Sequence, residues 1–193
     1  MVKIDELERV EVASTQELRE WFEENYAQAE SIWLVTYKKN VPDKYVSIQQ
    51  VLDEVLCFGW MDGRRMKLDD ERTMQLLSPR KTQHWSKTYK DRVAKLEKAG
   101  RMHAAGLEAI AVSKENGLWD FLNDVDALIK PNDLVEALEL HPPALENYET
   151  FPDSAKRDIL RWIKLAKKPE TRAKRILKTA QLAAENKRAS GTK

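Results

Sequence analysis

The 193-residue sequence contains one cysteine, six glycines and three histidines, and each low count excludes a class of protein. The single thiol, Cys57, cannot form a disulfide within the chain, which argues against a disulfide-rich secreted domain and favours a reducing compartment. The histidines are scattered, with neither the HExxH nor the HxxxH spacing of a zinc site. The glycines form neither a P-loop nor a GxGxxG motif. We therefore expect no metal and no cofactor.

Long hydrophobic runs are also missing. No stretch approaches the roughly 20 apolar residues that a membrane-spanning helix requires. Residues 1–12 lack the apolar segment of a secretory signal. We therefore expect a cytoplasmic protein without membrane insertion. Apolar residues make up 42% of the chain, which is enough for a hydrophobic core and argues against disorder.

The net charge is only +1, but acidic and basic residues are grouped in blocks. Residues 1–30 and 120–150 are acidic, whereas 64–101 and 154–188 each carry twelve basic residues. We interpret the blocks as helix faces that attract one another within one fold. The alternative is a basic surface for phosphate, nucleic acid or an acidic partner. Nucleic acid is not expected, because the overall balance is not basic and the basic helices lack interleaved aromatic residues.

Apolar periodicity predicts an α+β protein, in which a small N-terminal β-sheet with two helices is followed by an α-helical C-terminal half. The expected order up to residue 78 is β-α-β-α-β-β, with strands in VEVAS, 31–37, 60–67 and TMQLLS and helices over 15–29 and 48–59. From Ser86 onward the spacing is helical. We divide the chain into a core domain over 1–117, a helical segment over 130–188 and a frayed tail over 189–193.

The stretch GWMDGRR is the first candidate for a binding site. Alternation along a strand places Trp60, Asp62 and Arg64 on one face. A planar guanidinium beside an indole suits a small polar or anionic ligand. The alternative is a bulge or turn at Asp62 and Gly63 with solvated charges, and both interpretations stay open.

The stretch SPRKTQHWS follows the second strand of the expected hairpin. The hairpin would bring Arg80, His84, Trp85 and Ser86 towards the GWMDGRR stretch. The backbone N–H groups after Ser86 open a helix that favours anions. The alternative is a loop that caps this helix, with Trp85 anchored in the core. No catalytic set is predicted. In an enzyme, Asp62 would be the general acid or base, with the two arginines of the site stabilising charge.

The C-terminal helices combine an apolar face with a basic one. Ile159, Trp162 and Ile163 share one face of the first helix, and Ile176, Leu177 and Ala180 repeat the pattern in the second. The expected structure is a helical hairpin that packs on the rest of the protein. The alternative is a basic surface that binds a protein partner.

Two motifs carry a family resemblance. EVLCFGWMDGRRMKLDDERTMQLLSPRKTQHWSK resembles the GWIDG…SPR…WS signature of the YdeI/OmpD-associated, or bacteriocin-protection, family, and AKKPETRAKRI resembles its C-terminal AKxPETRxxRI pattern. The resemblance covers roughly residues 11–187. Tyr89 stands where similar sequences often have asparagine, and the linker KTQH also departs from the pattern.

The resemblance implies a bacterial stress-resistance or bacteriocin-protection protein, without implying a reaction. Combined with the candidate site, it predicts a non-enzymatic protein that binds a small polar or anionic ligand. The alternatives are an enzyme acting on such a ligand and a protein-interaction module that uses the basic C-terminal helices.

Overall fold

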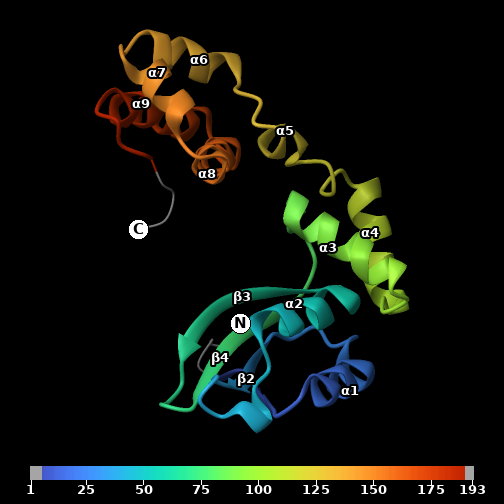
Figure 1. Cartoon of the computed structure of the whole chain (residues 1–193). Coiled ribbons are helices and arrows are strands. Elements are labelled where there is room, and N and C mark those ends of the chain that lie inside the picture. The colour runs from blue at the N-terminus through green and yellow to red at the C-terminus, as the bar shows by residue number, and fades with distance from the viewer. Residues whose placement is uncertain (1–5, 190–193) are drawn as a thin grey trace. The chain divides into compact units, whose positions relative to one another are not determined.

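The computed structural model describes residues 6–189 and divides into two compact units, Met1–Asp120 (unit 1) and Phe121–Lys193 (unit 2). The fold class is α+β, as predicted: a four-stranded sheet lies in unit 1, and unit 2 is helical (Figure 1). The elements of unit 1 are β1 (Arg9–Val12), α1 (Thr15–Asn25), β2 (Ile32–Tyr37), the 3-10 helix η2 (Pro42–Lys44), α2 (Ile48–Cys57), β3 (Trp60–Lys67), β4 (Arg72–Pro79), α3 (Lys87–Lys98) and α4 (Ala104–Glu115).

The strand order in the sheet is β1-β2-β4-β3. β1 pairs with β2 in parallel, and α1 is the crossover between them. β4 is antiparallel to both β2 and β3, so β3 and β4 form the expected hairpin. The hairpin places the end of β4 beside the start of β3, which positions the candidate site.

Two serines start the helices that cover the sheet. The Ser14 hydroxyl accepts the backbone N–H of Glu17 at 3.1 Å and begins α1. Ser47 forms a complete capping box with Gln50 at the start of α2. These bonds satisfy N–H groups that the first helical turn leaves without partners. Both helices begin where the sequence predicts them, at Thr15 and Ile48.

Alternate residues of the sheet contribute to two apolar clusters. Ile32 and Leu34 of β2 lie in the main core of unit 1 with side chains from α1 and α2. Trp33 and Val35 lie on the opposite face of β2, where they pack with Met74. The strand is therefore buried on both faces, which explains its nearly continuous apolar sequence.

The turn from α2 into β3 depends on close backbone packing against α4. Gly59 has φ +72°, a conformation that favours glycine, and a Cβ there would lie 2.9 Å from the carbonyl oxygen of Ala105. A Cβ on Gly106 would lie 2.2 Å from the carbonyl oxygen of Cys57. Glycine at these two positions lets the end of α2 and the start of α4 approach each other.

Unit 2 contains α5 (Asn123–Asp126), α6 (Asn132–Glu139), α7 (Ala144–Thr150), α8 (Asp153–Lys164) and α9 (Pro169–Ala184). Its core takes Ile159 and Ile163 from α8 and Ile176 and Ala180 from α9, as the apolar pattern predicted. Leu177 differs from that prediction, because 46% of its surface is exposed.

The predicted frayed tail is only partly described. Ala189 is buried in the core of unit 2, and residues 190–193 lie outside the described residues. No helix in the described part of the chain is long and apolar enough to cross a membrane.

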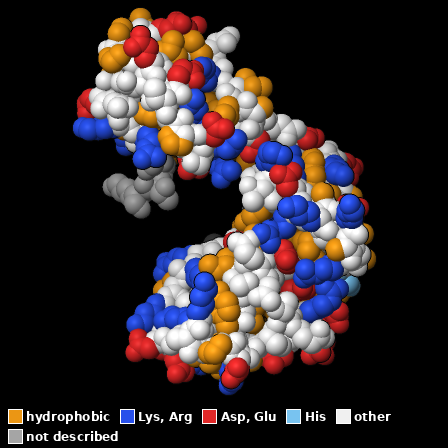
Figure 2. Space-filling view, in the orientation of Figure 1, with side chains coloured by type: hydrophobic (Ala, Val, Ile, Leu, Met, Phe, Trp, Pro, Cys, Tyr) orange, Lys and Arg blue, Asp and Glu red, His pale blue; other side chains and the backbone are white. Residues whose placement is uncertain are grey.

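The charge blocks of the sequence pair within the chain. In unit 1, Arg72 of the first basic block lies 2.6 Å from Glu11 of the acidic N-terminal block. In unit 2, Lys164 of the second basic block lies 2.5 Å from Asp124 of the other acidic block. Basic and acidic side chains are accordingly interspersed over the visible surface (Figure 2). Attraction between blocks within one fold was the favoured interpretation, and these ion pairs agree with it.

Candidate functional site

A β-bulge changes which side chains of β3 share a face. Asp62 pairs with Leu77 and Arg65 pairs with Gln75, so two residues of β3, Gly63 and Arg64, lie opposite the single residue Leu76 of β4. Arg65 therefore lies on the face of Asp62. Simple alternation, which placed Arg64 there, is wrong at this point.

Arg64 lies outside the cluster that the sequence predicted. Its side chain is exposed, and its guanidinium contacts the sulfur of Met66 at 2.8 Å. Met66 pairs with Met74, whose side chain belongs to the cluster on the other face of the sheet. Gly63 lies within the irregular segment, which matches the alternative interpretation of the Asp62 and Gly63 step as a bulge.

Asp62 is held by side chains from two other elements. The Tyr89 hydroxyl of α3 donates to Asp62 Oδ1 at 2.5 Å, and Gln75 Nε2 of β4 donates to Oδ2 at 3.4 Å. Gln75 is only 6% exposed, so this amide needs a partner inside the protein. The carboxylate is thus fixed at the junction of the hairpin and α3.

The Arg80 guanidinium lies in an unusual environment for a charged group. Its guanidinium stacks on the Trp85 ring at 3.9 Å and donates to the carbonyl oxygen of Gln83 at 3.2 Å. Burial lowers the Arg80 pKa to about 10, although the nearby Tyr89 and Asp62 partly counteract this effect. Among residues 6–189, Arg80 forms no ion pair and its buried Nε–H has no acceptor.

Trp85 adds a second unpartnered donor beside Arg80. Its side chain is completely buried and packs against the ring of Trp119, with the ring centroids 5.0 Å apart. Its indole N–H has no acceptor in the described structure. Most buried N–H groups in proteins have an acceptor, and Arg80 Nε–H and the Trp85 indole N–H are two exceptions within the described residues.

Arg80 also lines an open cavity of about 360 Å³ in unit 1. The end of α2 and the start of β3 contribute Phe58, Gly59 and Trp60, the end of β4 contributes Pro79, Arg80 and Lys81, and the remaining walls are Tyr26, Ala27, Ala105, Glu108, Ala109, Val112 and Ser113. Most of these side chains are apolar, and the charged ones are two bases and one acid. The volume and the mixture of surfaces are typical of a site for a small ligand.

Trp60 and Ser86 have mainly structural surroundings. Trp60 is 1% exposed, and its indole N–H donates to the carbonyl oxygen of Tyr26 at 2.9 Å, so the ring is a satisfied part of the core beneath the cavity. Ser86 precedes α3 as its N-cap, but its hydroxyl forms no capping bond. Ser86 therefore lies at the predicted start of the helix, but its side chain makes no capping hydrogen bond.

The structure adds three polar residues that the sequence interpretation missed. Tyr89 and Gln75 hold Asp62, and Arg65 takes the place that alternation gave to Arg64. Arg65 donates to the Thr73 hydroxyl at 2.8 Å, and its buried Nη1 has no partner among the described residues. Tyr89 already differed from the family pattern, which was the one sequence signal for its role.

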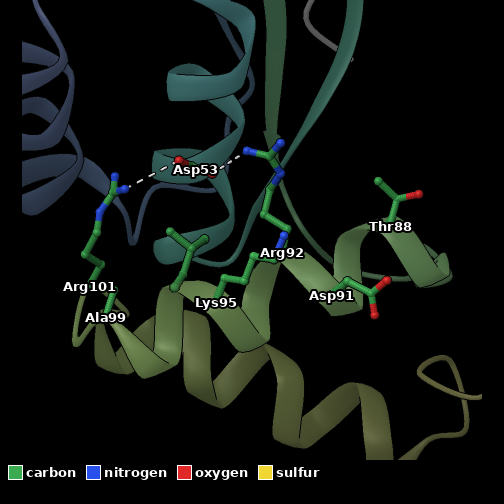
Figure 3. Close-up of a pocket in the computed structure, with 8 residues that line it drawn as sticks. Asp53, Thr88, Asp91, Arg92, Lys95, Ala99 and Arg101 are labelled. Atoms are coloured by element: carbon green, nitrogen blue, oxygen red, sulfur yellow. Dashed lines mark hydrogen bonds and ion pairs between the residues drawn. The ribbon is translucent and has the colours of Figure 1, made fainter.

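A second cavity of about 470 Å³ is lined by side chains from α2, α3 and the segment after α3 (Figure 3). Arg92 and Arg101 reach Asp53 from two sides, with N–O distances of 2.5 and 3.4 Å. Arg101 also pairs with Glu54 at 2.5 Å, and Arg19 of α1 pairs with the same buried carboxylate at 3.1 Å.

These ion pairs already neutralise the arginine charges that line the second cavity. A negative ligand there would compete with Asp53 and meet repulsion from Asp91, another residue of the cavity wall. The arrangement suits a network that ties α1, α2 and α3 together. Arg80, which lacks such a carboxylate partner, is the better candidate for binding an anion.

Cys57 and the acidic turn of Asp69, Asp70 and Glu71, between β3 and β4, offer no alternative site. Burial raises the Cys57 pKa to about 11, so the thiol is protonated at neutral pH. Asp69 is engaged by Arg72 and by backbone N–H groups of its own turn. In the described residues no group of three or more histidine, cysteine, aspartate or glutamate side chains is placed to hold a metal ion.

Comparison with known proteins gives two family matches. Residues 10–109 match the model described as "Domain of unknown function (DUF8412)". Residues 127–186 match the model described as "Bacteriocin-protection, YdeI or OmpD-Associated". No curated protein and no solved structure matches the chain.

The second match contains AKKPETRAKRI and confirms the family resemblance for residues 127–186. The GWMDG, SPR and WS motifs lie within the first match, which covers half of the chain. The chain therefore belongs to the DUF8412 family through residues 10–109 and carries a bacteriocin-protection, YdeI or OmpD-associated domain at residues 127–186.

Proposed function

We propose that this protein contributes to bacteriocin protection or stress resistance by binding a small anionic ligand at the cavity lined by Arg80. The observation that carries the proposal is the Arg80 guanidinium, which is stacked on a buried indole and forms no ion pair among the described residues. A guanidinium that is partly shielded from water is stabilised most by an anion that accepts hydrogen bonds from two of its N–H groups.

The cavity also restricts the body of the ligand. Apolar groups from Tyr26, Pro79 and Val112 lie on its wall, so a short apolar or planar body fits beside the acidic group. Lys81 adds a second positive charge at the same wall, and Glu108 opposes it. A carboxylate or phosphate on a compact organic body satisfies these surfaces better than an inorganic ion does.

The test is a thermal-shift screen of the full chain against carboxylates, sugar phosphates, nucleotides and cell-wall fragments. A ligand that binds only the folded state raises the melting temperature. The wild type is compared with Arg80→Ala and with Arg64→Ala as a matched control, because Arg64 is an exposed arginine on the other side of the same hairpin.

We expect at least one anionic compound to stabilise the wild type and Arg64→Ala but not Arg80→Ala. A shift that survives in Arg80→Ala, or no shift with any class of compound, contradicts the proposal. Protection in cells gives the second readout: folded Arg80→Ala protein that protects as well as the wild type also contradicts it.

The enzyme alternative depends on Asp62 as a general acid or base. Both of its carboxylate oxygens accept side-chain hydrogen bonds, which favours an orienting role. An Asp62→Asn protein that binds the ligand as well as the wild type, but no longer converts it, would support catalysis instead.

A further inference from the structure

The cavity lined by Arg80 also contains a carboxylate on a different wall. The residues of α4 that line this cavity recur along one face of the helix: Ala105, Glu108, Ala109, Val112 and Ser113. Glu108 lies on this face, whereas Arg80 lines the cavity from the segment that ends β4. The cavity therefore has a negative group on its α4 wall and a positive group on its β4 wall.

These two charges do not neutralise each other. Among residues 6–189, neither Glu108 nor Arg80 forms an ion pair. Lys81 lines the same cavity and likewise has no carboxylate partner in the described part of the chain. A purely anionic ligand bound to Arg80 would be repelled by Glu108, whereas a ligand that also carries a positive charge would be attracted by both groups.

The contacts of Arg80 place it towards the C-terminal end of α4. Arg80 stacks on Trp85, and Trp85 packs against Trp119. The Trp119 backbone N–H donates to the Ser113 carbonyl oxygen, in the last turn of α4, at 2.8 Å. Glu108 precedes Ser113 by about one and a half helical turns, or roughly 7 Å along the helix axis. The two charges thus lie at different levels of the cavity, which suits a ligand with one charged group at each end.

We propose that the cavity binds a compact zwitterion, with its carboxylate or phosphate on Arg80 and its ammonium group on Glu108. This inference rests on the proposed function, because it needs an anionic group at Arg80. Apolar groups of Pro79, Ala109 and Val112 line the same cavity, so a short carbon chain between the two charged ends has apolar surface to contact.

The test is a chemical-shift titration of the full ¹⁵N-labelled chain with two matched pairs of compounds. The compound γ-aminobutyrate is compared with butyrate, and aminoethyl phosphate is compared with ethyl phosphate, so each pair differs by one ammonium group. We expect the zwitterion of at least one pair to bind about three- to fivefold more tightly than its partner, because an ion pair with an exposed carboxylate contributes modestly. The shifted resonances should belong to α4 and the end of β4.

Two substitutions on α4 separate the cavity from the general charge of the helix. Glu108→Gln removes the carboxylate of the cavity, and Glu115→Gln removes an exposed carboxylate that does not line it. We expect the preference for the zwitterion to fall below about 1.5-fold in Glu108→Gln and to stay at the wild-type value in Glu115→Gln. Glu108→Gln should bind butyrate at least as tightly as the wild type does, because the repulsion is lost.

Arg80→Ala separates this inference from the proposed function. If both members of each pair bind the wild type equally and Arg80→Ala binds neither, the zwitterion is overturned and the proposed function stands. Binding that survives unchanged in Arg80→Ala overturns both. The inference is also overturned if none of the four compounds binds the wild type, or if Glu108→Gln and Glu115→Gln lose the preference equally.

Discussion

The Tyr89 hydroxyl donates a hydrogen bond of 2.5 Å to the carboxylate of Asp62, which lies 27 positions earlier in the chain. The bond connects α3 with β3 at the point where the bulge redirects the strand. Asp62 and Arg80 face the same helix, because Arg80 lies 5.8 Å from the Tyr89 ring. Tyr89 of α3 is therefore close to residues of both sequence motifs, Asp62 of GWMDGRR and Arg80 of SPRKTQHWS.

Replacing Tyr89 by phenylalanine removes the donor and keeps the ring. We expect the free energy of unfolding to fall by about 1–2 kcal/mol, because a partly buried carboxylate loses a hydrogen bond. Urea denaturation of Tyr89→Phe measures the change. Tyr45→Phe is the control, since no hydrogen bond of its hydroxyl occurs within the described residues. Equal free energies of unfolding for Tyr89→Phe and the wild type would show that this hydrogen bond does not stabilise the fold.

Gly106→Ala tests the close approach of α4 to the end of α2. Helix propensity alone would stabilise the variant by about 1 kcal/mol. The added Cβ, however, would lie 2.2 Å from the Cys57 carbonyl oxygen, and the backbone on both sides must move. We expect a net loss of at least about 2 kcal/mol, because overpacking of backbone against backbone cannot relax through a rotamer. Glu115→Ala, at an exposed position of the same helix, should change stability by less than about 0.5 kcal/mol. A Gly106→Ala protein as stable as that control would contradict the packing argument.

The stability of unit 2 should fall in acid. Hydrogen bonds from Arg172 lower the pKa of Asp133, and a hydrogen bond from Lys130 lowers the pKa of Glu149, from ordinary values of 3.8 and 4.5. The unfolded chain therefore binds more protons as the pH drops, and unfolding becomes more favourable. This contribution is present above the ordinary values and is lost as the pH falls through the lower folded values.

Urea denaturation at several pH values measures this dependence. An Asp133→Asn/Glu149→Gln variant, which lacks both titrating groups, should lose less stability than the wild type between about pH 6 and about pH 3. Parallel pH profiles for the two proteins would show that these ion pairs do not contribute as the structure indicates.

Cys57 should be unreactive in the folded protein. Its side chain is completely buried, and burial raises its pKa to about 11, so neither access nor thiolate is available near neutral pH. We expect a thiol-specific reagent to label Cys57 only after a denaturant is added. Rapid labelling of the native protein would show that the end of α2 opens readily.

The sequence by itself determined the order and type of the N-terminal elements. Ser14 and Ser47 marked two helix starts through local hydrogen bonds, and the apolar run of β2 identified a strand buried on both faces. The hairpin of β3 and β4 followed from their short connection. Such signals are local, so periodicity and capping residues are sufficient to read them.

Tertiary structure decided which side chains form the site. The bulge moved Arg64 away and placed Arg65 beside Asp62, because one extra residue in a strand reverses the faces of those that follow. Tyr89 and Gln75 became partners of Asp62 only through the docking of α3 and β4. Leu177 remained exposed, although its spacing matched the buried face, because helix periodicity gives a broad stripe and the packing of neighbouring helices selects the covered part.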